Sequence, residues 1–224
     1  MWLYNDVTQL VGMILMIIGA ILPIVNPLGD APIFLAMTEG CDAVTRKELA
    51  KRIGIYSFFL LLGSILIGSL VLRLFGLSIP IVQVAGGAVV CALGWNILSD
   101  IAPKSINLAV DPQLVAAVVM ARALYPLTMP VSIDAGAIAI AITVGAHHAT
   151  TIQYAIVQIL ASTIGAGVIA LSILFTYRYA QWIGNKVGPT GMTAALRLSA
   201  FITLCIGVSI CWDGVKTLFA QIGT

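Results

Sequence analysis

Long runs without a charged side chain recur along this chain and determine the environment in which it can fold. Four of them are entirely uncharged: Val7–Val25, Ile53–Leu72, Leu74–Ser99 and Ala149–Tyr177. Two more, Pro112–Ala146 and Val187–Leu218, are apolar apart from a few ionisable residues. Because a helix needs about 20 mainly apolar residues to cross a hydrocarbon core, each segment is long enough to span a membrane. The sequence therefore predicts an all-α polytopic membrane protein with six transmembrane helices.

The composition agrees with that prediction and excludes several functional classes. Of the 224 residues, 9% are charged and 60% are hydrophobic, whereas soluble domains carry about 25% charged residues. The formal net charge of +2 is small and dispersed, which argues against a nucleic-acid partner. The opening stretch MWLYNDVTQL contains no Lys or Arg and so lacks the positive n-region of a signal peptide. We therefore expect the first helix to remain in the mature protein.

Patterns that indicate enzymes or metal sites are missing from the sequence. It contains no His-Glu-x-x-His, Gly-x-Ser-x-Gly or Gly-rich phosphate-binding pattern. The four cysteines have no metal-ligand spacing and are interpreted as small apolar residues. His147 and His148 are adjacent, a spacing that does not suit a metal site, and we interpret them as exposed loop residues. We therefore expect no enzymatic activity, cofactor or metal, so that any driving force comes from a gradient or a partner chain.

Positive charges are distributed unequally between the two sets of loops. The first, third and fifth loops carry Arg46, Lys47, Lys51, Arg52, Lys104, Arg178 and Lys186. The opposite side carries Arg73 and Lys216. Short loops rich in Lys and Arg stay in the cytoplasm. We therefore expect the loop at 38–52 to be cytoplasmic and both termini to lie outside.

Two proline-containing clusters interrupt the predicted first and fourth helices. They are NPLGDAP at 26–32 and YPLTMPVSIDAG at 125–136, and each has a Pro-Leu pair followed by a second proline. As one helix, the segment at 7–37 would extend about 46 Å at 1.5 Å per residue, beyond a hydrocarbon core of about 30 Å. A proline inside a helix also clashes with the carbonyl of the residue four positions earlier. Both segments are therefore predicted to be discontinuous helices.

The paired clusters also predict an internal repeat. Residues 1–105 and 106–224 each contribute three helices, and together they form one membrane domain. An odd number of spans inverts the second half relative to the first. The sequence therefore predicts a 3+3 inverted-topology repeat, an architecture common among secondary transporters.

Four segments of the chain match a known family in order. They are NPLGDAPIFL (26–35), FGLSIPIVQVAGGAVV (75–90), YPLTMPVSIDAGAIAI (125–140) and LRLSAFITLCIGV (196–208). At these residues, and over nearly its whole length, the chain resembles the MarC family of prokaryotic inner-membrane proteins. The resemblance implies a six-helix protein of the cytoplasmic (inner) membrane and, for some members, uptake of small neutral amino acids such as glycine and alanine. The chain departs from the family at one motif: Asp134-Ala135-Gly136 stands where the family usually has Gly-Pro-Gly, which adds a carboxylate beside the expected site.

The two breaks predict one binding site if they meet near the middle of the membrane. Helix N-termini carry partial positive charge and unpaired N–H groups that suit a carboxylate, and helix C-termini offer carbonyls to an ammonium group. The second half-helices are expected to begin after Asn26-Pro27 and after Pro126. The candidate substrate-binding residues are Asn26, Pro27, Gly29, Asp30, Tyr125, Thr128, Ser132, Asp134 and Gly136. Such a site favours a small zwitterion over a simple anion or a drug-sized molecule.

Several of these residues also have a structural interpretation. Asp30 and Asp134 either carry a proton or bind the substrate's ammonium group, or they are helix N-caps, and these roles are compatible. Arg122 is either a partner of one of these carboxylates or a side chain that reaches the membrane interface. Gly86 and Gly87 either permit close helix packing or leave space for the substrate.

The sequence is most consistent with a secondary transporter of small neutral amino acids, coupled to a proton or cation gradient. Its partners would be the small-molecule substrate and the lipid bilayer, and a homo-oligomer is compatible with the sequence. Two alternatives remain open. One is a passive pore or an exporter for another small solute, and the other is a membrane scaffold without transport activity.

Overall fold

The computed structural model describes residues 2–38, 40–99, 120–146 and 152–222, and every element in these ranges is a helix. The first half contains α1 (Trp2–Val25), α2 (Pro27–Met37), α3 (Ala43–Leu74) and α4 (Ile79–Ser99). The second half contains η1 (Ala123–Ser132), α6 (Ala135–Gly145) and α7 (Ile152–Ile222). Lys104, the expected boundary at 105/106 and the pair His147-His148 lie outside the described residues.

Five helical segments are long and apolar enough to cross a membrane. They are Val7–Met37, Ala43–Leu74, Ile79–Ser99, Tyr154–Gly188 and Thr190–Ala220. The pair formed by η1 and α6 bends by 71° at its junction and brings the number to six if it is counted as one span. The prediction of an all-helical membrane protein is therefore confirmed for the described part of the chain, with five to six candidate spans.

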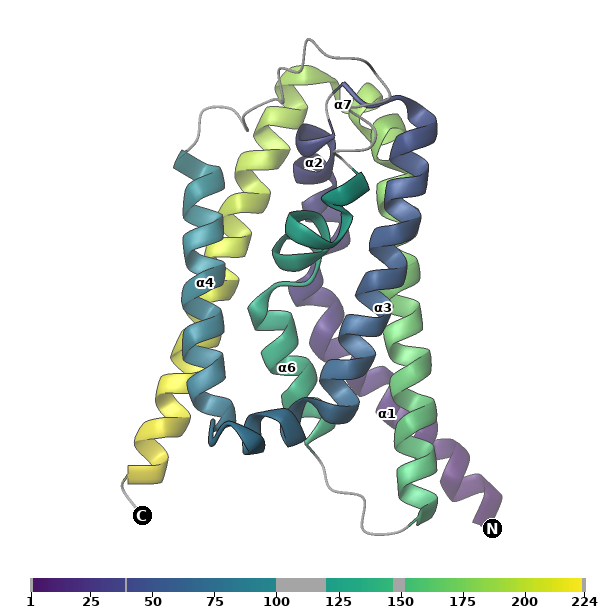
Figure 1. Ribbon diagram of the computed structural model, residues 1–224, viewed down its shortest axis with the longest axis vertical. Helices are drawn as coiled ribbons and strands as arrows, with labels where there is room; N and C mark the ends of the chain where they lie inside the picture. Colours follow the sequence, from purple (N-terminus) through teal and green to yellow (C-terminus); the bar gives the residue numbers. More distant parts are fainter. Residues whose placement is uncertain (1, 39, 100–119, 147–151, 223–224) are drawn as a thin grey trace.

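The longest element, α7, folds back on itself at Gly188. This residue has a φ of 74°, in the left-handed region that favours glycine, so the helix reverses there without strain from a side chain. Figure 1 shows the first part of α7 rising beside α1 and α3 and the second part descending beside α4. The start of α1 and the end of α7 consequently lie at the same end of the bundle.

Small residues allow α4 to pack closely against the second part of α7. A Cβ atom added to Gly87 would lie 2.7 Å from the carbonyl oxygen of Gly207, and one added to Gly94 would lie 2.7 Å from the backbone nitrogen of Leu204. Lipid chains are as apolar as leucine, so helices in a membrane associate through close van der Waals contact of this kind. These contacts therefore support the interpretation that Gly87 permits close helix packing.

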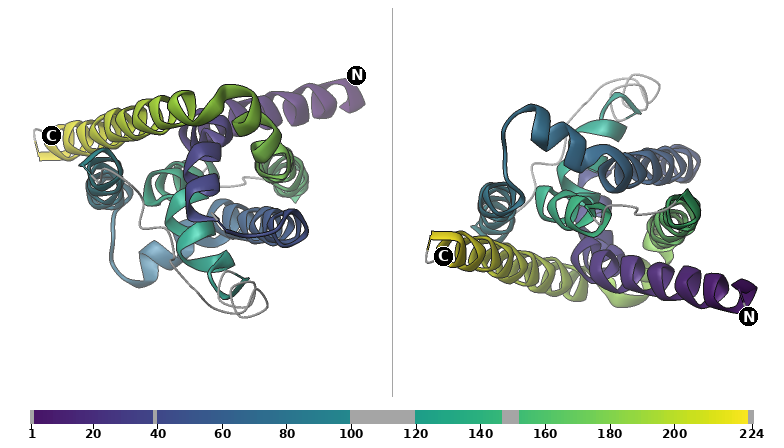
Figure 2. Two further views of the ribbon diagram at one scale, coloured as in Figure 1. Left: turned by 90° about the horizontal axis from the view of Figure 1, so that it is seen from above. Right: turned by 90° about the horizontal axis from the view of Figure 1, so that it is seen from below.

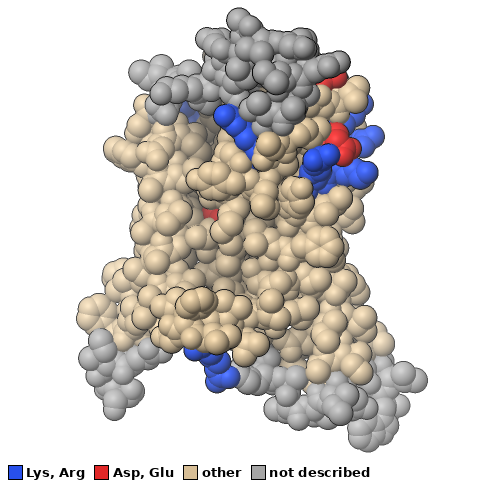
Figure 3. Space-filling model, in the orientation of Figure 1, with Lys and Arg blue, Asp and Glu red and all other residues tan. Residues whose placement is uncertain are grey.

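Basic side chains gather near the end of the bundle opposite the termini (Figure 3). There Arg46 connects the segment after α2 to α7. Its guanidinium donates to the carbonyl oxygens of Thr38 and Cys41, both at 3.0 Å, and to Oε1 of Gln181 at 2.6 Å. At the start of α3, the side chain of Asp42 accepts a hydrogen bond from the backbone nitrogen of Thr45, and hydrogen bonding to the side chain and then to the backbone of Thr45 lowers the pKa of Asp42.

Candidate functional site

The first break consists of one residue, Asn26, between α1 and α2. Its φ of 38° and ψ of 61° are left-handed, a conformation that Asn tolerates better than most residues. Its Oδ1 accepts a hydrogen bond of 3.3 Å from the backbone nitrogen of Gly29 and so caps α2. Pro27 follows at the first helical position, where a missing N–H costs nothing. An added Cβ on Gly29 would collide with the Asn26 amide, so this cap requires glycine there.

The second break lies between η1 and α6. Within η1 the backbone is non-helical at Tyr125 and Met129, and two side-chain hydroxyls donate to carbonyls five residues earlier: Thr128 to Ala123 and Ser132 to Leu127, each at 2.7 Å. The helix α6 begins after Asp134, whose Oδ1 accepts a hydrogen bond of 2.6 Å from the backbone nitrogen of Ala137.

Two sequence interpretations change at these breaks. The expected start of the second half-helix after Pro126 is wrong, because Pro126 lies inside η1 and the capping carboxylate is that of Asp134. The capping interpretation holds for Asp134 but not for Asp30, because Asn26 provides the cap of α2.

The two half-helices that follow the breaks are matched in length and oppositely directed. Both α2 and α6 contain 11 residues, and Figure 1 shows them running away from the middle of the bundle toward opposite ends. Viewed along the bundle, α2 lies beside η1, and α3, α4 and α7 lie around them (Figure 2). Both helix starts therefore face the interior of the bundle.

A pair of buried carboxylates lies where these helix starts approach one another. Asp30 is 7% exposed and Asp134 is 8% exposed, and they are close enough to interact electrostatically. Neither forms an ion pair with a Lys or Arg in the described part of the chain. Figure 3 shows an acidic side chain in a recess halfway along the bundle. Ionisable residues inside a membrane domain are candidates for binding a proton or a cation, and these two carboxylates are such candidates.

Tyr177 completes this region from α7 and was not identified from the sequence. Its hydroxyl lies 2.8 Å from Oγ of Ser132, and its ring stacks on Phe34 with a centroid distance of 4.4 Å. The side chain is 1% exposed and is close enough to Asp30 for an electrostatic interaction. Tyr177 thus joins α2 and η1 at the carboxylate pair. It lies within an uncharged apolar run, so no local pattern distinguishes it from a lipid-facing aromatic residue.

The predicted site residues differ in exposure. Those that are buried are Pro27, Asp30, Thr128, Ser132, Asp134 and Gly136, and those that are half-buried are Asn26 and Gly29. Tyr125 is 71% exposed, in contrast to the others. Arg122 is also exposed and forms no ion pair with a described acid, which favours the interface interpretation of this residue.

Two glycines allow neighbouring helices to approach the start of α6. A Cβ atom added to Gly86 in α4 would lie 2.9 Å from the carbonyl oxygen of Ala135. One added to Gly136 would collide with the side chain of Ile210 and lie 3.2 Å from Oδ1 of Asp134. Gly86 therefore serves the approach of α4 to the second break. No group of His, Cys, Asp and Glu side chains among the described residues is arranged to hold a metal ion.

Comparison with known proteins places the chain among integral membrane proteins. Residues 8–219 match the family described as MarC family integral membrane protein. The chain is 33% identical over 194 residues to UPF0056 membrane protein YvbG of Bacillus subtilis, covering 87% of this chain and 90% of that protein. It is 28% identical over 224 residues to UPF0056 inner membrane protein MarC of Salmonella typhimurium, covering 94% and 96% of the two chains. No solved structure matches it.

Proposed function

The chain belongs to the MarC family of integral membrane proteins, and on that premise we propose that it is a secondary transporter of small neutral amino acids resembling glycine or alanine. In this proposal it acts in the cytoplasmic membrane, uses a proton or cation gradient, and moves its substrate without chemical conversion. The observation that carries the proposal is the convergence of two helix starts on a buried carboxylate pair. Such a combination offers complementary charge to both ends of a zwitterion.

The residues that cap α2 and α6 differ in charge, and this difference would set the orientation of a bound amino acid. The start of α2 is capped by the neutral amide of Asn26, and the carboxylate in its first turn, that of Asp30, would have to carry a proton for this helix start to attract a substrate carboxylate. The start of α6 is capped by a carboxylate of the protein itself, that of Asp134. The substrate's carboxylate would therefore bind at α2, and its ammonium group would bind at Asp134 with Asp30 nearby.

The carboxylate pair also provides a means of coupling. In this proposal the coupling proton is carried by Asp30 or Asp134 and is released when another cation takes its place. An incoming ammonium group is such a cation. Because the proton and the ammonium group would compete for Asp30 and Asp134, movement of the amino acid would be coupled to movement of a proton.

The breaks also suggest how the site could face each side of the membrane in turn. We assign α1–α2 and η1–α6 as the discontinuous first and fourth helices of two inverted halves, 1–105 and 106–224. Rocking of one half against the other around a fixed central site would then give alternating access. The distribution of Lys and Arg supports an orientation with both termini outside.

Uptake into proteoliposomes tests the proposal. Purified protein is reconstituted, and accumulation of radiolabelled alanine is measured with and without an imposed pH gradient. We expect accumulation above equilibrium only with the gradient. Equilibration without accumulation would instead indicate a passive pore, and the absence of flux for any solute tested would indicate a scaffold.

A charge-neutral variant tests the role of the carboxylate pair. Asp134→Asn retains a side-chain oxygen for the cap of α6 but removes the titratable group. Its uptake should lose the dependence on the pH gradient. Asp42→Asn is the matched control, because Asp42 caps α3 in the same way and is exposed at the end of the bundle. Uptake by Asp134→Asn that matches the wild type in rate and pH dependence would exclude a proton-carrying role for this residue.

A further inference from the structure

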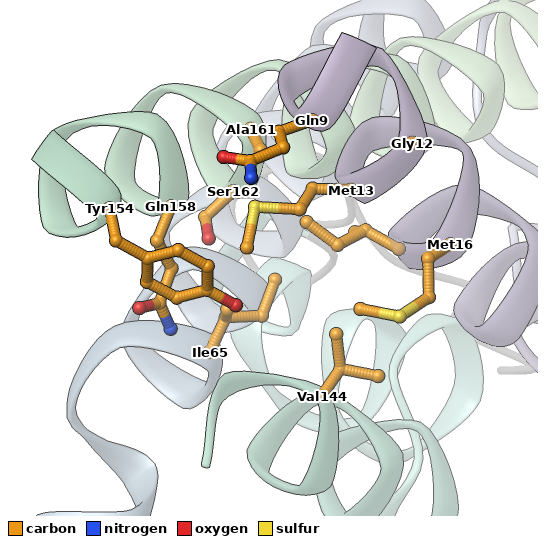
Figure 4. Close-up of a pocket in the computed structure, with 11 residues that line it drawn as sticks. Gln9, Gly12, Met13, Met16, Ile65, Val144, Tyr154, Gln158, Ala161 and Ser162 are labelled. Carbon is orange, nitrogen blue, oxygen red and sulfur yellow. The ribbon is translucent and has the colours of Figure 1, made fainter. Parts of the chain in front are cut away.

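A cavity separate from the carboxylate pair lies near the end of the bundle where α1 and α7 begin. Its volume is about 290 Å³, and side chains from α1, α3, α6 and α7 line it (Figure 4). Val144, near the end of α6, forms part of its wall, whereas Asp134 caps the opposite end of that helix. The cavity is therefore about one half-helix away from the site at the breaks.

The lining has the composition of a small-molecule pocket. None of the lining residues is charged, and most of the wall is apolar, with two methionines, Met13 and Met16, on the α1 side. The polar groups are few and come mainly from α7, at Tyr154, Gln158 and Ser162. Nε2 of Gln158 donates to the carbonyl oxygen of Gly145 at 3.1 Å, which fixes the orientation of this amide. Apolar walls with a few directed polar groups are typical of ligand sites.

The hydroxyl of Ser162 has no hydrogen-bond partner within the described part of the chain. Its residue is 0% exposed, so a water-sized molecule in the cavity does not touch the hydroxyl in its present position, although Figure 4 shows the side chain on the wall of the cavity, beside Tyr154 and Met13. A serine in a helix usually bonds to a carbonyl of the preceding turn, as Thr163 does to Ile159 at 2.8 Å. A buried hydroxyl without this bond lacks a partner, and a small shift of the Ser162 side chain would bring it within reach of a molecule in the cavity.

We propose that this cavity binds a small, uncharged aromatic molecule with one hydroxyl or amide group, such as a phenol. The absence of charge from the lining disfavours an ion, and 290 Å³ lies at the lower end of the range for ligand pockets. Methionine side chains adapt to a ligand and make favourable contacts with the edges of aromatic rings. The ligand's polar group would bond to Ser162. Because the lining comes from both halves of the chain, the ligand would contact both.

A fluorine NMR titration tests the site with the full chain in lipid nanodiscs, using 4-fluorophenol as the probe. We expect saturable binding that Ser162→Ala weakens by about 5- to 10-fold, the loss typical of one hydrogen bond. Ser57→Ala is the matched control, because Ser57 is the other buried hydroxyl without a partner in the described residues and does not line the cavity. Its affinity should equal that of the wild type. Toluene, which lacks the hydroxyl, should compete less well than phenol, and benzoate should not compete.

A second pair of variants blocks the cavity without altering the hydroxyl. Gly12 lines the cavity and Gly19 does not. At either position an added Cβ atom would have no neighbour within 4 Å, so both positions accept a larger side chain. Gly12→Leu should abolish saturable binding, and Gly19→Leu should leave it unchanged. Binding that survives Gly12→Leu would overturn the location of the site. Equal affinities for phenol and toluene would overturn the role of Ser162 and show that the cavity accepts any apolar molecule.

Discussion

The approach of α4 to the start of α6 predicts that Gly86→Ala destabilises the protein. The added Cβ atom would lie 2.9 Å from the oxygen and 3.1 Å from the carbon of the Ala135 carbonyl, whereas ordinary contacts begin at 3.4 Å. These are backbone atoms and cannot rotate away, so the two helices must separate by about 0.5 Å. Overpacking of this kind costs about 1–3 kcal/mol, and the higher helix propensity of alanine offsets about 1 kcal/mol of it.

A matched substitution removes the propensity contribution from the comparison. A Cβ atom added to Gly63 in the middle of α3 has no neighbour within 4 Å, so Gly63→Ala gains the propensity without the clash. The free energy of unfolding, measured by circular dichroism during titration of detergent-solubilised protein with sodium dodecyl sulfate, should be about 1–3 kcal/mol lower for Gly86→Ala than for Gly63→Ala. Equal values for the two variants would refute the close contact of α4 with the second break.

The remaining predictions concern the aromatic contact and the orientation. Tyr177→Phe keeps the ring but removes the hydroxyl that bonds to Ser132, so the free energy of unfolding should fall by about 0.5–1.5 kcal/mol in the same titration; an unchanged value would show that this hydrogen bond adds nothing. In whole cells, an impermeant maleimide should label a cysteine introduced at Asn5 and spare one introduced at Lys47, because the loop rich in Lys and Arg is expected inside. The reverse labelling would invert the assigned orientation.

The start of α2 was predictable from the sequence, whereas the start of α6 was not. Asn26-Pro27 combines a residue that tolerates left-handed backbone with one that suits the first helical position, so the local chemistry alone locates the start of α2. Pro126 suggested an equivalent start in the second half. The segment around it is instead the interrupted helix η1, and α6 begins only where Asp134 provides a cap. Pro126 and Asp134 both mark a possible helix start, and the periodicity of hydrophobic residues does not decide between them.

The roles of Gly86 and Tyr177 were not predictable, because they depend on contacts with residues that are distant in the sequence. The spacing of Gly86 and Gly87 allowed both packing and space for a substrate, and only the position of Ala135 shows which backbone Gly86 faces. Tyr177 lies 45 residues from its hydrogen-bond partner Ser132, and no local pattern in the sequence connects the two. Local patterns therefore predicted the spans and the carboxylates, but not the side chains from α7 that surround them.

Binding of alanine and of its methyl ester tests the central claim most directly, which is that the two helix starts form one site for a zwitterion. The measurement is isothermal titration calorimetry of the purified protein with L-alanine and with L-alanine methyl ester, which keeps the ammonium group but has no carboxylate. Loss of a charge-assisted interaction at the start of α2 should weaken binding of the ester by about 10- to 100-fold. Equal affinities for the two compounds would contradict a carboxylate site at this helix start.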